Sequence, residues 1–122
     1  MQKLIFIVDD NDANLAVAAC ALEEEYRILT IPSAQKMFSL LEKKKPDLIL
    51  LDVEMPEVSG LEAAARLKEN HLWKDIPVLF LTSYCDEKLL SEAKKSGALE
   101  IIYKPFIPSK LLESVKKYAE AE

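Results

Sequence analysis

Short apolar runs alternate with amphipathic segments along almost the whole chain. The runs occupy residues 4–8, 26–31, 48–51, 78–81 and 101–103. Continuous apolar runs of this length are typical of parallel strands that are covered on both faces. The pattern therefore predicts five strands buried in the interior of the protein.

The segments between these runs carry apolar residues at helical spacing. The residues that mark the five expected helices are Leu15, Ala19 and Leu22, then Met37, Leu40 and Leu41, then Leu61, Ala64 and Ala65, then Leu89, Leu90 and Ala93, and finally Leu111, Leu112, Val115 and Ala119. Ser59 followed by Glu62 has the form of a capping box, Gly97 can end the fourth helix in a left-handed conformation, and Pro108 can begin the fifth.

Strict alternation of strand and helix determines the expected fold class. Parallel strands joined by right-handed helical crossovers form a doubly wound α/β fold, with helices on both faces of the sheet. We therefore expect a five-stranded parallel sheet with five helices in three αβα layers. No linker, repeat or low-complexity segment interrupts the pattern, so residues 1–122 are interpreted as one domain.

Composition narrows the function classes. The net charge is −5, and Lys43–Lys45 is the longest basic run, so a nucleic-acid-binding surface is not expected. No apolar run approaches the roughly 20 residues of a membrane span, and no secretion signal is evident. Cys20 and Cys85 lack metal or disulfide spacing, and Cys20 is interpreted as a small core residue. A cytoplasmic protein fits these features best.

Polar residues follow four of the five strands where each strand ends. They are Asp9 and Asp10, Asp52, Thr82 and Ser83, and Lys104. Ligands of open α/β sheets bind beyond the carboxyl ends of the strands, so these side chains are expected to converge. Each residue alone could be a helix cap or a surface residue, and Asp12 is assigned to capping. Their joint placement favours a functional site.

The chemistry of this set indicates a metal-assisted phosphoryl transfer. Carboxylates a few ångströms apart repel by about 4 kcal/mol per pair at an effective dielectric constant of ~20, so a cation is needed to keep them ionised. Oxygen ligands without histidine or cysteine favour Mg²⁺. Magnesium, a lysine and a hydroxyl can position and neutralise a transferring phosphoryl group, and a carboxylate can be its acceptor.

Four segments closely resemble the response-regulator receiver domain of two-component signalling, to which the chemotaxis regulators belong. They are IFIVDDN at 5–11, LLDVEMPEVSG at 50–60, LFLTS at 79–83 and GALEIIYKPF at 97–106. The resemblance covers essentially the whole chain and implies a flavodoxin-like fold. It implies a phosphorelay protein that modifies only itself, so an enzyme acting on other substrates is not expected.

The resemblance also implies residue roles. Asp52 would accept the phosphoryl group, Mg²⁺ would be held by Asp10, Asp52 and the backbone carbonyl of Glu54, and Asp9 would act through a metal-bound water. Thr82 would donate to the phosphoryl group and Lys104 would neutralise one of its oxygens. Pro105 would follow a cis peptide bond.

Expected partners follow from the same family. A sensor histidine kinase or a histidine phosphotransfer protein would supply the phosphoryl group, and a downstream effector protein or domain would read the phosphorylated state, with a phosphorylation-dependent dimer as another outcome. His71 is interpreted as an exposed loop residue and not as a donor. No effector domain follows Glu122, so the chain is either a stand-alone regulator or a receiver from a longer protein.

One position departs from the family pattern. Ile101 stands where the family usually has Tyr or Phe, so the aromatic flip linked to activation cannot occur there. Strand alternation places Tyr103 on the same face, and we consider that Tyr103 carries part of the coupling or only packs. Glu54 and Tyr84 flank the site and are expected to govern the lifetime of the phosphoryl group, with Tyr84 the bulkier screen.

Three alternative functions compete with this interpretation. A haloacid-dehalogenase-type hydrolase would explain Asp10-Asn11-Asp12 but not the segment around Asp52, and its later acidic pair is missing. A phosphate-binding loop of the GxxxxGK[ST] type is absent, because the sequence has only two glycines, Gly60 and Gly97. The main rival is an interaction module that keeps the fold but works unphosphorylated. This alternative stays open because Ile101 replaces the aromatic residue that the family uses in activation.

Overall fold

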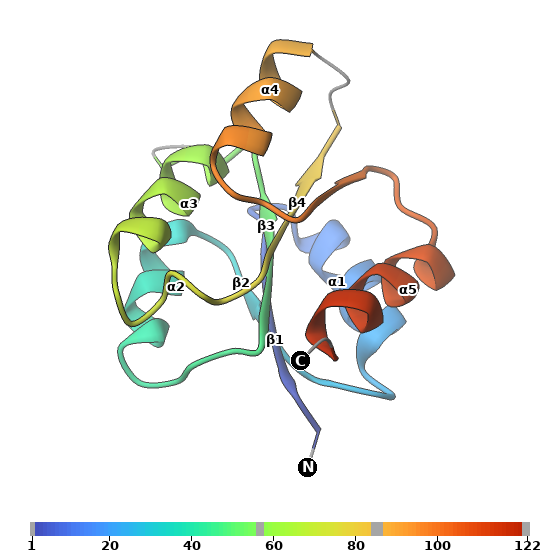
Figure 1. Ribbon diagram of the computed structural model, residues 1–122. Helices are drawn as coiled ribbons and strands as arrows, with labels where there is room; N and C mark the ends of the chain where they lie inside the picture. Colours follow the sequence, from blue (N-terminus) through green and yellow to red (C-terminus); the bar gives the residue numbers. More distant parts are fainter. Residues whose placement is uncertain (1, 56–57, 84–86, 121–122) are drawn as a thin grey trace.

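A computed structural model describes residues 2–55, 58–83 and 87–120 of the chain. Helices and strands alternate strictly, as the sequence predicts (Figure 1). The elements are β1 (Leu4–Val8), α1 (Asp12–Leu22), β2 (Arg27–Ile31), α2 (Ala34–Leu41), β3 (Leu48–Asp52), α3 (Gly60–Glu69), β4 (Val78–Thr82), α4 (Glu87–Lys95), β5 (Glu100–Tyr103) and α5 (Pro108–Ala119).

The strands form one parallel sheet in the order β2-β1-β3-β4-β5. From β1 the chain moves outward to β2 and then crosses to β3 on the other side, so the strand order reverses between β1 and β3. At such a point the loops leave the sheet in opposite directions and open a crevice at the carboxyl ends of the strands. The fold class is confirmed, and Asp9, Asp10 and Asp52 lie at the strand ends where the order reverses.

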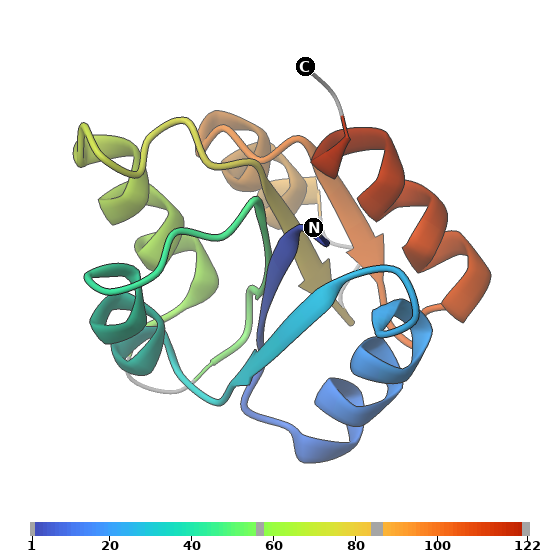
Figure 2. The ribbon, with the colours of Figure 1, turned by 90° about the horizontal axis from the view of Figure 1, so that it is seen from below.

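Helices cover both faces of the sheet, with α2 and α3 on one side and α1 and α5 on the other (Figures 1 and 2). Alternate residues of each central strand point to opposite faces. Phe6, Ile49 and Phe80 pack on the side of α2, α3 and α4. Ile7 and Leu50 pack with α1 and α5. This division of the apolar residues produces two cores and three layers.

Burial differs between the central and the outer strands. Every residue of β1, β3 and β4 is buried, whereas β2 has a single buried residue and β5 has none. The two edge strands are still covered on both faces, but only partly: Leu29 and Ile101 pack against one core, and Ile28 and Ile102 pack against the other. Each has a neighbour on one side only, and the helices on the two faces leave its outer side open.

Helix ends follow the expected chemistry with two corrections. Ser59 Oγ accepts from the Glu62 N–H, but the Glu62 carboxylate pairs with Arg66 instead of completing a capping box. The cap of α1 is Asn11, whose side chain accepts from Asn14 N–H. Asp12, assigned to capping, is the first residue of that helix, where its charge favours the positive end of the helix dipole.

Two other expectations about helix ends are confirmed, and one about packing is not. Gly97 has φ 88°, the left-handed conformation expected after α4, and Pro108 is the first residue of α5. Cys20 is exposed, although the sequence indicated a core position, because α1 turns Ala18 and Leu22 inward instead. None of the helices in the described ranges is long and apolar enough to cross a membrane.

Candidate functional site at the carboxyl edge of the sheet

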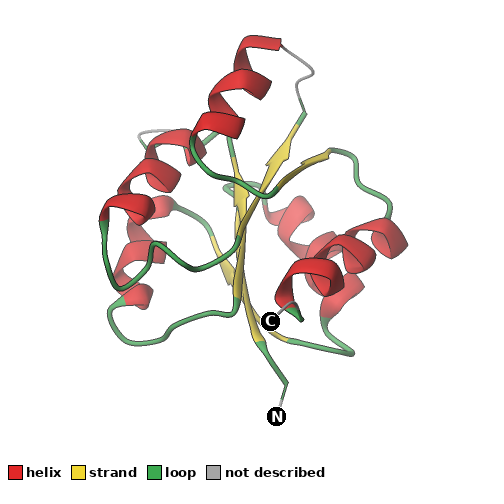
Figure 3. Cartoon of the chain, in the orientation of Figure 1, coloured by secondary structure: helices red, strands yellow, loops and turns green. Residues whose placement is uncertain are grey.

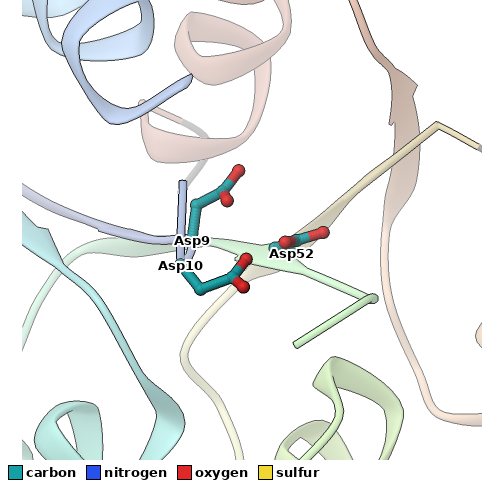
Figure 4. Close-up of side chains that lie close together, drawn as sticks. All are labelled: Asp9, Asp10 and Asp52. Carbon is teal, nitrogen blue, oxygen red and sulfur yellow. The ribbon is translucent and has the colours of Figure 1, made fainter. Parts of the chain in front are cut away.

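Three aspartates meet where β1 and β3 end (Figure 4). Asp9 and Asp10 directly follow β1, and Asp52 is the last residue of β3. Carboxylate oxygens of the three residues lie within 4.8 Å of one another. Asp9 and Asp52 are each 1% exposed, whereas Asp10 is exposed. The cluster therefore has two buried members and one that faces solvent.

Lys104 lies between the two buried carboxylates. Its Nζ is 2.8 Å from Asp9 Oδ2 and 3.1 Å from Asp52 Oδ1. The lysine directly follows β5, and its backbone N–H donates to the Thr82 carbonyl at 2.8 Å, which holds it at the edge of β4. The Lys104–Pro105 peptide bond is cis, as the family resemblance implies. An internal ammonium thus neutralises part of the acidic cluster.

Backbone N–H groups of the loops after β1 and β3 fix the direction of the two buried aspartates. The Asn11 N–H donates to Asp9 Oδ1 at 2.9 Å, and the Glu54 N–H donates to Asp52 Oδ1 at 3.1 Å. The Asp9 N–H donates to the Ile31 carbonyl at 3.0 Å, so β2 also supports the cluster. All the loops involved leave the sheet at the same edge (Figure 3). The Asp9 and Asp52 carboxylates therefore have little freedom to rotate.

The end of β4 carries a second group of contacts. Thr82 is 1% exposed, and its hydroxyl donates to Glu54 Oε1 at 2.5 Å. The Ser83 N–H donates to the same oxygen at 3.0 Å. Glu54 follows β3 by two residues, so its side chain reaches across from the β3 loop to the end of β4. This places Thr82 and Glu54 beside the aspartates, connected by hydrogen bonds.

Burial and neighbouring charge change the ionisation of the site. Burial raises the pKa of Asp52 to about 7; the charge of Asp9 adds to this increase, and Lys104 and the Glu54 N–H oppose it. Burial alone would lower the pKa of Lys104, but its contacts with Asp9 and Asp52 outweigh that effect and raise the pKa above its usual value. Lys104 is therefore charged, while the Asp52 carboxyl resists ionisation because it is buried beside the charge of Asp9.

The cluster has the donor set of a divalent cation site. Asp9 Oδ2 is buried and, among the described residues, accepts no well-formed hydrogen bond, although it is ion-paired with the Lys104 ammonium. Three carboxylates and one ammonium carry a net charge of −2 when all are ionised. Hard carboxylate oxygens at this spacing suit a small divalent ion. The residues present fit such a metal.

The residues expected from the sequence do come together. Asp9, Asp10, Asp52 and Lys104 form one cluster, and Thr82 adjoins it through Glu54. The sequence assigned the backbone carbonyl of Glu54 to the metal and placed Glu54 beside the site as a residue that governs phosphoryl lifetime, but it missed the contacts of the side chain with Thr82 and Ser83. A carboxylate two residues after Asp52 was the available signal, but nothing in the sequence indicated that it bonds to the end of β4.

The remaining expectations concern residues around the site. His71 is exposed, as expected. Ile101 packs, partly buried, against the core on the side of α2, α3 and α4, and Tyr103 is 42% exposed, two residues further along β5. Tyr84, expected to screen the phosphoryl group, lies outside the described residues.

Comparisons with known proteins agree with this geometry. The family model of the response regulator receiver domain matches residues 5–116. The chain is 39% identical over 115 residues to the phosphate regulon transcriptional regulatory protein PhoB of Pseudomonas aeruginosa, covering 93% of this chain and 50% of PhoB. It is 31% identical over 119 residues to the polar-differentiation response regulator DivK of Brucella ovis, covering 97% of both chains.

Solved structures give the same result. The chemotaxis protein CheY4 of Vibrio cholerae superimposes with a TM-score of 0.91 at 25% sequence identity, covering 97% of this chain and 99% of CheY4. The chain spans half the length of PhoB but nearly all of DivK and CheY4. This chain belongs to the response regulator receiver domains of two-component systems, the family that is phosphorylated on an aspartate with the help of Mg²⁺.

Proposed function

We propose that Asp52 is the phosphoacceptor of this receiver and that its phosphorylation requires Mg²⁺. The observation that carries the proposal is the position of Lys104, whose ammonium contacts both buried carboxylates beside an exposed third one. A site of this kind can stabilise the three oxygens of a transferring phosphoryl group.

The two oxygens of Asp52 have different roles. Oδ1 accepts from the Glu54 N–H and faces Lys104, so it is held by the protein. We therefore assign attack on phosphorus to Oδ2. As the Oδ2–phosphorus bond forms, the bond from phosphorus to the donor's nitrogen or oxygen breaks, and the donor leaves with that electron pair. The product is an aspartyl phosphate, which water later hydrolyses.

The other residues bind, orient and neutralise. Asp10, Asp52 and the Glu54 carbonyl would hold Mg²⁺, with Asp9 acting through a bound water. The ion supplies positive charge that keeps the carboxylates ionised and offsets the transferring oxygens. Lys104 pairs with one phosphoryl oxygen, and the Thr82 hydroxyl donates to another once it turns toward Asp52.

Phosphorylation then acts as a switch. Movement of Thr82 toward the phosphoryl group changes the balance between two arrangements of α4, β5 and α5, and a partner that prefers one of them reads the change. A histidine kinase or a phosphotransfer protein is the donor in this proposal, and a downstream effector is the reader. The chain modifies only itself, acts as one domain over residues 1–122, and functions in the cytoplasm, where cysteines are kept reduced.

Intact-mass spectrometry after incubation with acetyl phosphate and Mg²⁺ tests the proposal. Wild type should gain one phosphoryl group, and the isosteric Asp52→Asn variant, or wild type in EDTA, should gain none. Beryllofluoride, a phosphoryl mimic that is not hydrolysed, excludes rapid hydrolysis as the cause of a negative result. If folded wild type binds Mg²⁺ but neither gains a phosphoryl group nor binds beryllofluoride, the unphosphorylated interaction module is favoured. Equal gain by Asp52→Asn would place the acceptor elsewhere.

A further inference from the structure

Glu54 contacts the end of β4, including the Thr82 hydroxyl that a phosphoryl group on Asp52 would need. Its Oε1 atom accepts two hydrogen bonds at once, from the Thr82 hydroxyl at 2.5 Å and from the Ser83 N–H at 3.0 Å. Glu54 is partly buried, and Thr82 is 1% exposed. Hydrogen bonds to an ionised carboxylate are shorter and stronger than those between neutral groups. The contact therefore holds the end of β4 against the loop that follows β3.

A hydroxyl has one proton to donate. While the Thr82 O–H points at Glu54, it cannot also point at an oxygen bound to Asp52. The Ser83 N–H is likewise a single donor directed at the same carboxylate oxygen. The Glu54 carboxylate and a phosphoryl oxygen are both acceptors, so they compete for the single Thr82 proton, while the Ser83 N–H helps to hold Glu54 in place. One of them must leave when the other binds.

We propose that the Glu54 side chain is a resting-state latch, which holds Thr82 and Ser83 until a phosphoryl group on Asp52 displaces it. Glu54 is thus a positioning residue that acts through Thr82. This inference rests on the proposed role of Asp52. It assigns to the side chain a task separate from that of the Glu54 backbone carbonyl, namely to set how readily the phosphorylated arrangement forms.

The latch sets a threshold on switching. A ligand shifts a two-state equilibrium only by its difference in affinity for the two states. The hydrogen bonds of Glu54 with Thr82 and Ser83 exist only in the resting state, so they reduce the free energy by which a phosphoryl group favours the other state. Removing them should leave the switch easier to operate, with Thr82 released in a larger fraction of unphosphorylated molecules.

The first arm examines the resting protein without metal or phosphoryl group. Nuclear magnetic resonance of the Ser83 amide reports on its bond to the Glu54 carboxylate. In Glu54→Ala the Ser83 amide proton should shift upfield and become more sensitive to temperature. Glu54→Gln, which keeps a side-chain oxygen as acceptor, should fall between Ala and wild type. An unchanged Ser83 resonance in Glu54→Ala would overturn the latch.

The second arm measures the affinity for beryllofluoride in saturating Mg²⁺. Glu54→Ala should bind about tenfold more tightly than wild type, because one or two charge-assisted hydrogen bonds no longer compete. Part of any gain could come from removing negative charge near an anion. The same substitution is therefore made in a Thr82→Ala background, where that charge effect persists but the hydroxyl does not.

The comparison between backgrounds decides the outcome. The latch predicts a gain in the Thr82 background that is several-fold larger than in Thr82→Ala, and a smaller gain for Glu54→Gln than for Glu54→Ala. Equal gains in both backgrounds would mean that Glu54 acts only through its charge. If wild type bound no beryllofluoride, the proposed function would fail, and so would the idea that the latch controls switching. The Ser83 resonance would still show whether Glu54 holds the end of β4.

Discussion

Asp52 is a carboxylate placed at the tip of the fully buried strand β3. Burial and the neighbouring Asp9 raise its pKa to about 7, from an ordinary value of 3.8. The folded protein without metal therefore keeps a proton on Asp52 at a pH where the unfolded chain has lost it. A raised carboxyl pKa makes stability fall as the pH rises through this window.

The resulting prediction compares wild type with Asp52→Asn in EDTA. Between pH 5 and pH 8 the variant should gain stability relative to wild type by up to about 3 kcal/mol, since a neutral amide escapes the cost of ionisation. Urea unfolding at several pH values measures the difference. Saturating Mg²⁺ should reduce the relative gain, because the ion stabilises the ionised wild-type site. Parallel pH profiles of the two proteins in EDTA would contradict the raised pKa.

At this scale the sequence predicted which residues meet but not how they bond. Asp9, Asp10, Asp52 and Lys104 could be anticipated because strand ends of a parallel sheet share one edge. The Glu54 side chain could not, since its direction depends on the loop after β3 and on the distance across to Thr82. Likewise, Asn11 and Asp12 both follow the paired acids, and only the backbone conformation shows that Asn11 is the cap.

Among the elements, β3 and α3 approach each other very closely near the site. The Gly60 N–H donates to the Val53 carbonyl at 2.9 Å, and a Cβ on Gly60 would lie 2.2 Å from the Asp52 carbonyl oxygen and 2.7 Å from Val53 Cα. Both neighbours are backbone atoms, so no side chain can move aside. Only a glycine lets α3 begin this close to the end of β3.

Gly60→Ala should therefore displace either the start of α3 or the backbone of Asp52. We expect a loss of about 1–3 kcal/mol in the free energy of unfolding, typical of overpacking a buried site, together with weaker Mg²⁺ binding. Chemical denaturation and metal titration measure the two effects. Ala65→Gly, at an exposed position of the same helix, is a control that should cost about 1 kcal/mol without changing metal affinity. Equal Mg²⁺ affinity in wild type and Gly60→Ala would show that the junction does not position Asp52.

The sequence predicted strands best where a short apolar run is also fully buried in the fold. The apolar runs of β1, β3 and β4 are buried throughout, and their bounds differ from expectation by at most one residue. The run at β5 looks equally apolar, yet Ile101 and Ile102 are only partly buried because no strand lies beyond them. Sheet order is a property of the whole fold, and short apolar runs do not encode which strand is at an edge.

For the whole molecule, the two cores share the three central strands. Residues of β1, β3 and β4 alternate between the core under α2, α3 and α4 and the core under α1 and α5. If either core opened, the apolar residues on one face of β1, β3 and β4 would be exposed to water. We expect residues 1–122 to unfold in a single cooperative transition, as one domain.

Coincident transitions by two probes measure this cooperativity. Trp73, which packs beside Phe38 with ring centroids 5.8 Å apart, reports by fluorescence on the side of α2 and α3. Far-ultraviolet circular dichroism reports on all helices. The two urea midpoints should agree within error in the presence of Mg²⁺. An earlier fluorescence transition would indicate that the α2–α3 side opens separately.

The aspartate cluster lies at the tips of the strands that hold the molecule together, which has a consequence for laboratory evolution. Stability and chemistry make opposite demands on the same few positions, as is common at active sites. A library selected only for survival at high temperature in a chelator should enrich neutral residues at Asp52 or Asp9. Selection for heat resistance alone would therefore identify the positions that we propose for phosphoryl transfer, because those are the positions whose aspartates it would replace.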